Sequence, residues 1–334
     1  MRVAIAGCGL ISRAHIDALR RVQGVEIVAV CDSDRMKADR TAGARGIPRS
    51  YGDLSSLLSE SRPDVVHVLT PPRSHRELAI AALEAGCHVL VEKPMAIDGC
   101  EADLMVTTAR RLGLTLSVCH NLLFDPAIIE ARALVAQGAI GKVVAVDIFW
   151  GYFHGWMDRL RADHWMHELP GGYLQEMAPH PVYLLQEFLP DSRLVSATAR
   201  KADQAGIGLL FAGPSGPGVV ALSLSATPYR RFVTLHGTEM SIGADITNST
   251  LVRFRQGRPG SERQSLDHGL QLVWGGLRKA VGKRVDRASG ELAISHRRFI
   301  EAFYRCLRDG TTPPVTAGAG HAVVATLDRI WNHV

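Results

Sequence analysis

The sequence predicts an α/β protein in which a doubly wound parallel sheet is followed by an α+β domain built on a largely antiparallel open sheet. The chain has 334 residues, which suggests about two domains. The first 120 residues alternate short apolar runs with helical patterns, whereas the sequence after Asn121 changes to closely spaced strand-like segments.

The strand-like runs of the first part are apolar throughout, without the alternation of a half-exposed strand. Such runs are typical of a sheet that is buried on both faces. They lie at Arg2–Ala6, Val25–Val30, Val65–Leu69, His88–Val91 and Leu114–Val118. Helical spacing fills Ile11–Val22, His75–Ala85 and Asp98–Leu112. This repetition of strand and helix predicts a parallel, doubly wound sheet.

The second part opens with a predicted helix over Pro126–Gln137, because proline suits the first helical turn. Strand-like segments follow at Lys142–Trp150, Arg193–Ala199, Ile207–Phe211, Val219–Ala226, Arg231–His236 and Thr250–Arg255. Two helices, Leu292–Arg308 and Gly318–Trp331, close the chain. We therefore expect domains at 1–121 and 122–334, with about 292–334 able to pack back on the first domain.

The composition, with 46% hydrophobic and 21% charged residues, is that of a soluble globular protein. No stretch approaches the roughly 20 apolar residues that span a bilayer, and no export signal is recognised at the start, so we expect a cytoplasmic protein. The net charge of +5 is too dispersed to indicate nucleic acid. Six cysteines form no Cys-x-x-Cys pair, so we interpret them as reduced core thiols and expect no metal site.

A glycine-rich turn joins the first strand to the first helix. Gly7 and Gly9 allow the backbone to approach a pyrophosphate, and the helix that begins at Leu10 and Ile11 offers free N–H groups to its phosphates. The usual third small residue is Ser12. Placed between a strand and a helix, this pattern predicts a Rossmann dinucleotide-binding domain.

Asp32 ends the second strand, 23 residues after Gly9. A carboxylate there accepts hydrogen bonds from both adenosine ribose hydroxyls and repels the extra phosphate of NADP, so we expect NAD. The alternative is that Asp32 caps a helix starting near Ser33. Arg35 leaves NADP open as the less favoured cofactor.

Three further motifs resemble the Gfo/Idh/MocA family of oxidoreductases, which includes glucose–fructose oxidoreductase and inositol dehydrogenase. They are Thr70–His75 (Thr-Pro-Pro-Arg-Ser-His), Val91–Pro94 (Val-Glu-Lys-Pro) and Gly171–His180. The resemblance is strong over residues 1–125 and returns at His296–Ile300 and Pro313–Val315; between 190 and 290 it is only a pattern of strands.

The resemblance implies that Lys93 is the active-site lysine beside the nicotinamide and that a cis peptide bond often precedes Pro94. It also implies that Thr70, Pro71, His75 and Glu92 lie at the cofactor site. Independently, Lys93 follows a buried strand at the carboxyl edge of a parallel sheet, where an ammonium can hydrogen-bond a substrate oxygen. The alternative is a surface lysine paired with Glu92.

His180 matches the family's catalytic histidine, the natural base for the hydroxyl proton of an alcohol. The alternative is a structural histidine among apolar residues. Glu176 replaces the usual aspartate four residues earlier; it can orient His180 or accept a substrate hydroxyl. Ala178 replaces a common glycine, and Tyr183 stands where many members carry another aspartate. These departures indicate a substrate subgroup that the sequence does not name.

The stretch Phe149–His167 holds three of the five tryptophans, interleaved with arginines and histidines. We take Trp156 and Trp165 as candidate sugar-stacking residues and Arg159 and Arg161 as a candidate clamp for a carboxylate or phosphate. The alternatives are a core or a subunit interface, and arginines that pair with nearby aspartates on an exposed loop.

An apolar row with basic residues at its end marks Leu270–Val285. It is interpreted as a helix packed on its own domain's sheet, with an amphipathic helix that touches a membrane or an anionic ligand as the alternative.

These observations predict hydride transfer between NAD and a secondary carbinol of a sugar, cyclitol or nucleotide-linked sugar. The resemblance also implies a homodimer or homotetramer. Two other functions stay open: a redox-neutral enzyme that retains NAD, like some family glycosidases, and a non-catalytic sensor of NAD or sugar. The sequence leaves open the substrate, the hydroxyl oxidised and the direction of the reaction.

Overall fold

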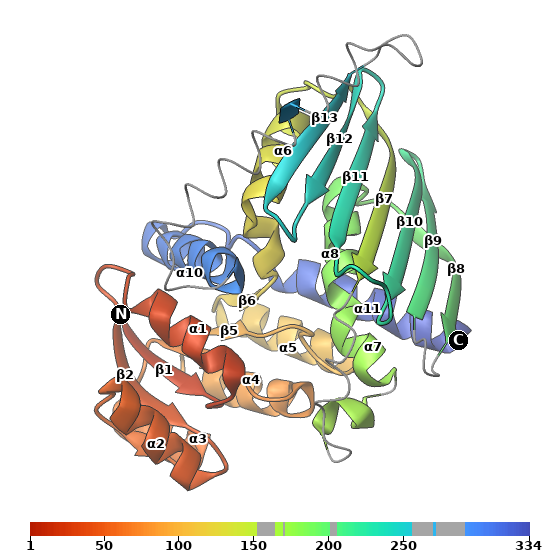
Figure 1. The fold of residues 1–334 in the computed structure, drawn as a ribbon. Coiled ribbons are helices and arrows are strands. Elements are labelled where there is room, and N and C mark those ends of the chain that lie inside the picture. Colours follow the sequence, from red (N-terminus) through yellow and green to blue (C-terminus); the bar gives the residue numbers. More distant parts are fainter. Residues whose placement is uncertain (152–163, 170, 201–205, 256–269, 272–290) are drawn as a thin grey trace. The chain divides into compact units, whose positions relative to one another are not determined.

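The computed structural model describes residues 1–151, 164–169, 171–200, 206–255, 270–271 and 291–334. The chain divides into two compact units (Figure 1). The first unit comprises Met1–Asn121 and Glu291–Asp328, and the second comprises Leu122–Gly290 and Arg329–Val334. Helix α10 (Glu291–Asp309) and most of α11 (Ala317–His333) therefore belong to the first unit.

The first unit is built on a six-stranded sheet in the order β3-β2-β1-β4-β5-β6. All of its pairings are parallel, with Ala6 opposite Cys31 on one side and Val68 on the other. The strands are β1 (Arg2–Ala6), β2 (Glu26–Cys31), β3 (Ser50–Tyr51), β4 (Val65–Val68), β5 (His88–Val91) and β6 (Leu116–Val118). The strand order reverses between β1 and β4, the point at which such sheets bind ligands at their carboxyl ends.

Capping side chains and left-handed glycines set where several helices around this sheet begin and end. They are α1 (Leu10–Leu19), α2 (Arg35–Arg45), α3 (Leu54–Ser61), α4 (His75–Glu84) and α5 (Gly99–Leu112). Asp34, Asp53 and Asp98 cap α2, α3 and α5 by accepting a backbone N–H. Left-handed glycines Gly46 and Gly113 end α2 and α5.

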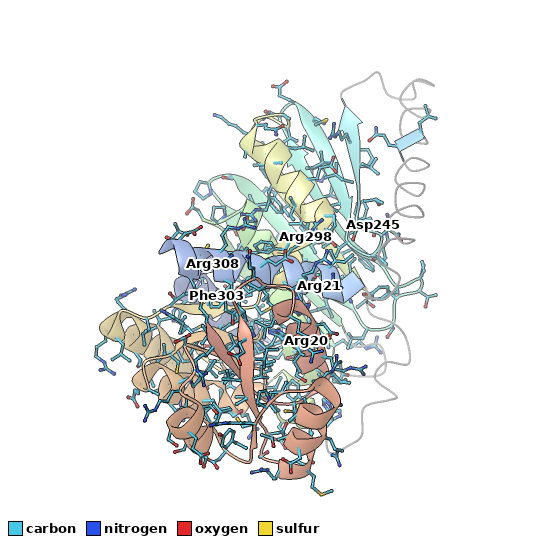
Figure 2. All side chains as sticks on the ribbon, turned by 90° about the vertical axis from the view of Figure 1, so that its left-hand side faces the viewer. Arg20, Arg21, Asp245, Arg298, Phe303 and Arg308 are labelled. Carbon is cyan, nitrogen blue, oxygen red and sulfur yellow. The ribbon has the colours of Figure 1, made fainter. Side chains whose placement is uncertain are left out.

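Helix α10 packs against α1 in the first unit. Its fully buried residues are Phe299, Ile300, Phe303 and Tyr304. Figure 2 shows Phe303 and Arg308 on α10, with Arg20 and Arg21 at the end of α1. The Arg308 guanidinium donates to the carbonyl of Gln23, 2.9 Å away, just beyond α1. The C-terminal part of the chain thus completes the unit that the N-terminal part begins.

The second unit is built on a seven-stranded sheet in the order β13-β12-β11-β7-β10-β9-β8. Every pairing is antiparallel except that of β10 with β7. Its strands are β7 (Val143–Gly151), β8 (Arg193–Arg200), β9 (Gly206–Gly213), β10 (Gly216–Ser223), β11 (Arg231–Gly237), β12 (Met240–Asp245) and β13 (Thr250–Arg255). The predicted fold class, a parallel sheet followed by a largely antiparallel one, is confirmed.

Helices cover one face of this second sheet (Figure 1). Helix α6 (Pro126–Ala136) packs on β12 and β13, and α8 (Pro179–Phe188) packs on β7 and β10. Alternate residues of β7, namely Val146, Ile148 and Trp150, are buried, as expected for a sheet covered on one side. Among the described residues, no helix is long and apolar enough to cross a membrane.

Candidate functional site

The turn after β1 has the shape of a phosphate-binding loop. Gly7 has φ +101°, and a Cβ there would lie 2.7 Å from the carbonyl carbon and oxygen of Leu69, so only glycine fits. A Cβ at Gly9 would meet no atom within 4 Å, which leaves open space in front of α1. Gly9 is also the N-cap of α1 and supplies no side-chain cap, so the first N–H groups of the helix have no side-chain acceptor from this residue.

The start of α1 is arranged for close approach of an anion. Leu10 is 90% exposed, whereas Ser12 is buried and its hydroxyl donates to the Gly9 carbonyl at 2.6 Å. Ile11 lies half-buried between them. A pocket of about 550 Å³ opens here, and its lining includes the basic residues Arg13 and Lys37. Backbone N–H groups, a helix N-terminus and cations together fit the diphosphate of a dinucleotide.

Asp32 lies at the end of β2 and faces this loop. Its Oδ2 accepts the Cys8 N–H at 2.8 Å and the Lys37 ammonium at 2.9 Å, and its Oδ1 accepts the Asp34 N–H at 3.1 Å. Burial raises the pKa of Asp32, but these three donors outweigh it and hold the pKa below its ordinary value. The alternative in which Asp32 caps the next helix is wrong, because Asp34 caps α2.

His75 braces two loops at the carboxyl edge of the sheet. Its ring is fully buried, with Nδ1 3.0 Å from the Pro94 carbonyl and Nε2 2.7 Å from the Thr70 carbonyl. Burial lowers the pKa of His75. Thr70 also accepts a hydrogen bond from Ser74, and Pro71 precedes the short helix η1 (Pro72–Ser74). The imidazole of His75 therefore contacts protein carbonyls on both sides and holds the Thr70 and Pro94 loops together.

Lys93 lies two residues after the end of β5, and the Lys93–Pro94 peptide bond is cis, as the resemblance implied. Glu92 is only 7% exposed and accepts the Lys93 backbone N–H on Oε2 at 3.1 Å. Glu92 is therefore a buried carboxylate and not a surface group, and its Oε1 lies 3.0 Å from His15 Nε2 inside the fold.

In the second unit, α7 (Gly172–Met177) and α8 carry Glu176 and His180, both more than nine-tenths buried. The His180 ring stacks on Trp150 of β7, with centroids 5.8 Å apart and planes 21° apart. His180 Nδ1 lies 2.9 Å from the Tyr183 hydroxyl, which accepts the Leu122 N–H at 3.2 Å. Sequence reasoning gave Tyr183 no role beyond a departure from the family pattern, although its three-residue spacing from His180 on one helix was a usable signal.

Gly171 and Gly172, at the start of α7, are both required to be glycine for structural reasons. A Cβ at Gly171 would overlap the Trp331 ring at 2.5 Å, and Gly172 has φ +57°. Trp165 lies half-buried in the short helix η4 (Trp165–Glu168), its ring 5.4 Å from that of His164. The other candidate substrate residues, Trp156, Arg159 and Arg161, lie outside the described residues, as does most of Leu270–Val285.

A nucleotide-binding parallel sheet with a lysine after β5, followed by a helix-backed sheet with a buried histidine, defines the class of two-domain oxidoreductases with a Rossmann domain. The chain belongs to the Gfo/Idh/MocA family: residues 1–120 match its oxidoreductase domain, described as an NAD-binding Rossmann fold, and residues 128–265 match its C-terminal domain.

Several curated proteins are similar to parts of the chain. D-apiose dehydrogenase of Paraburkholderia graminis is 32% identical over 200 residues, 59% of this chain and 52% of that protein. D-glucoside 3-dehydrogenase of Escherichia coli is 37% identical over 43% of this chain and 41% of its own length. The chain spans about half the length of the first of these relatives. D-xylose 1-dehydrogenase (NADP(+)) 2 of Haloferax volcanii is 26% identical over 92% of this chain and 89% of its own.

Among solved structures, the WlbA dehydrogenase of Bordetella pertussis, in complex with NADH and UDP-GlcNAcA, has a TM-score of 0.79. It is 21% identical, and the alignment covers 100% of this chain and 95% of that chain. Likeness at this identity shows the shared fold.

Proposed function

We propose that the protein is an NAD-dependent dehydrogenase that oxidises a secondary alcohol of a sugar, cyclitol or nucleotide-linked sugar. The observation that carries the proposal is the position of Lys93, two residues after the end of β5, at the edge of the parallel sheet where such folds bind ligands. The names of the relatives, which are dehydrogenases of apiose, glucosides and xylose, support the same substrate class.

The nicotinamide would supply the hydride acceptor, and the residues of the chain would handle the proton and the charge. Lys93 donates a hydrogen bond to the substrate oxygen as negative charge develops there. His180 takes the hydroxyl proton. For this it must present an unprotonated Nε2, which requires Nδ1–H to donate to the Tyr183 oxygen 2.9 Å away. Glu176 is assigned a supporting role toward His180 or a substrate hydroxyl.

The cofactor preference is assigned to Asp32. Two ribose hydroxyls need free lone pairs on this carboxylate, and the Lys37 ammonium occupies one of them. The Lys37 side chain is 40% exposed and can turn away when the ribose binds. Asp32 stays fixed by two backbone N–H groups, so its charge opposes the 2′-phosphate of NADP. Arg35, the residue that favoured NADP, instead donates to Asp39 at 2.9 Å.

The substrate is expected to carry a carboxylate or phosphate, held by Arg159 and Arg161 beside the aromatic residues Trp156 and Trp165. Replacing both arginines with glutamine should raise KM for an anionic substrate and change little for its neutral analogue. Unchanged kinetics with both substrates would assign this stretch a structural role.

Self-association is expected through the face of the second sheet opposite helices α6 and α8, giving a homodimer or homotetramer. Phe149, Leu210 and Val219 are 38%, 42% and 42% exposed on adjacent strands β7, β9 and β10. An apolar face of this kind is typical of a subunit interface. A Leu210→Glu variant should shift the oligomer toward monomer in light scattering; an unchanged mass would argue against this interface.

The test of the proposed function is a screen of sugars, cyclitols and nucleotide sugars for NADH formation. With the best substrate, Lys93→Ala and His180→Ala should each lower turnover by about 100-fold while NAD binding persists. Turnover of substrate without net NADH would indicate the redox-neutral alternative. Binding of NAD and sugar without turnover of any kind would indicate the sensor.

A further inference from the structure

A cluster of buried polar side chains lies inside the first unit, around Glu92, the residue before Lys93. His15 comes from α1, His67 from β4, and His296 and Tyr304 from α10. His15 and His296 approach Glu92, His67 contacts His15, and Tyr304 contacts His67. Their exposed fractions are 0%, 0%, 2% and 0%, and that of Glu92 is 7%. We call these five residues the Glu92 network. Polar groups buried to this degree are costly unless each is hydrogen-bonded.

The contacts form one continuous chain that ends on the carboxylate. The Tyr304 hydroxyl lies 2.9 Å from His67 Nε2, and His67 Nδ1 lies 2.9 Å from His15 Nδ1. His15 Nε2 lies 3.0 Å from Glu92 Oε1. Helices α1 and α10 and strand β4 therefore converge on the residue before Lys93.

The chemistry of these groups fixes the direction of every hydrogen bond. An ionised carboxylate only accepts, so His15 Nε2 carries the proton and its Nδ1 accepts. His67 must then donate from Nδ1 and accept at Nε2, and the Tyr304 O–H donates to it. Every group is satisfied with neutral imidazoles and one negative charge, on Glu92. Burial lowers the pKa of His15 and lowers that of His67 further, as this assignment requires.

His296, the Lys93 backbone N–H and the Cys119 thiol also approach the Glu92 carboxylate. Asn121 donates to His296 Nδ1 at 3.3 Å, which leaves the Nε2–H of His296 facing Glu92 Oε1 at 3.6 Å. Burial raises the pKa of Glu92, but the hydrogen bonds from His15 and His296 outweigh it and hold the pKa well below its ordinary value. Glu92 Oε2 accepts the Lys93 N–H.

The titratable groups that face Glu92 come from every element around it. Besides Lys93 they are His15, His67, His75, Cys119, His120 and His296. Burial lowers the pKa of His120 to about 3 and raises that of Cys119, so both are neutral. The Glu92 carboxylate, whose pKa is held low, is therefore a fixed negative charge next to Lys93 in the sequence.

We infer that Glu92 is a positioning residue for the Lys93 ammonium, and that the Glu92 network keeps it charged and fixed in place. The inference rests on the catalytic role proposed for Lys93. Glu92 anchors the backbone N–H of Lys93 through Oε2 and places a permanent negative charge one residue away, which favours the protonated amine. A charged ammonium is the form that donates to the substrate oxygen.

The same ligand atoms would also suit a divalent cation, since those of His15, Glu92, Cys119 and His296 lie within 4.8 Å of one another. The hydrogen-bonded chain is favoured because the 3.0 Å separation of His15 from Glu92 is a hydrogen-bond distance, and because the chain places every proton without an ion. Metal analysis of the purified protein separates the two.

The test compares Glu92→Gln with Tyr304→Phe and a control, Ser117→Ala, in the full-length protein. Gln keeps the shape of Glu92 and removes its charge. Phe keeps the ring of Tyr304 and removes the terminal donor of the chain. The control removes a hydrogen bond of similar burial in the same unit, from Ser117 to the Val315 carbonyl at 2.6 Å.

Glu92→Gln should lower kcat about tenfold, leave KM for NAD within about twofold, and move the alkaline limb of the kcat profile to lower pH. Tyr304→Phe should move the same limb in the same direction by less, and Ser117→Ala should leave it in place. An unmoved limb in both network variants, or stoichiometric zinc in the purified protein, would overturn the inference. Near-normal turnover of Lys93→Ala would instead refute the proposed function.

Discussion

Asp32→Asn is the sharpest test of how the first unit selects its cofactor. Two unit charges about 4 Å apart repel by about 4 kcal/mol at an effective dielectric constant of about 20. The Lys37 ammonium, 2.9 Å from Asp32, offsets part of this repulsion. If about half remains, the NAD-to-NADP affinity ratio should fall by a factor of about 30 when the charge is removed.

The same substitution has a small structural cost, because asparagine keeps one of the two oxygens that accept the Cys8 and Asp34 N–H groups. Losing one such bond at a partly buried site costs about 1 kcal/mol, which thermal unfolding would show separately from binding. Calorimetric titration with NAD and NADP at two salt concentrations measures the ratio, and salt should reduce the effect.

Asp34→Asn is the matched control for this experiment. The Asp34 side chain lies two residues away, is 56% exposed and caps α2, a role that asparagine fills equally well. It should leave the affinity ratio nearly unchanged. A ratio unaltered by Asp32→Asn, or altered as much by Asp34→Asn, would refute the assignment of cofactor preference to Asp32.

Three further predictions follow from the same geometry. Gly7→Ala should abolish NAD binding and destabilise the first unit by at least about 2 kcal/mol, measured by chemical denaturation, because the strained backbone and the Leu69 carbonyl both reject a Cβ. Tyr183→Phe should lower kcat by about tenfold and leave NAD affinity unchanged, because His180 loses its Nδ1 partner; equal kcat would refute this. Stability should decrease as pH falls below about 6.5, because burial lowers the pKa values of His15, His67 and His120, and the unfolded chain then binds more protons; a melting temperature that is flat from pH 7 to pH 5 would contradict this assignment.

Five of the six strands of the first unit were predictable from sequence, because each of the five is a continuous apolar run between turn residues. Some of the elements that were not predicted are short or polar. Strand β3 has two residues. Helix α2 was expected only as a helix starting near Ser33, without an end, because it buries only Ala38 and Ala42 and its pattern has almost no helical period. Strand β12 was missed because Met240–Asp245 contains a glycine and few β-branched residues, and its pairing with β11 decides its structure.

The residues of the candidate site also fall into two groups: those that the sequence predicted and those that it did not. Gly7, Asp32 and Lys93 were predictable, since a phosphate loop and the ends of parallel strands have local signatures. The partners of Glu92 were not, because His15 and Tyr304 are 289 positions apart and neither stands in a motif that marks it as polar core. A histidine on an apolar helix face has the same local pattern whether it is a satisfied core residue or part of a network; only the fold brings the partners together.

The position of α10 shows how contacts between residues far apart in the sequence bear on function. The first 120 residues supply the sheet, the phosphate loop and Glu92, but Tyr304 and His296 come from a helix that follows Leu122–Gly290 of the second unit in sequence. Without α10, the His67 Nε2 atom would lose its donor and the Glu92 carboxylate would lose one of its two imidazoles, leaving buried polar groups unsatisfied at a cost of about 1–3 kcal/mol each. Helix α10 therefore helps to hold the turn that carries Lys93. The residues of the Rossmann sheet alone do not form the complete site.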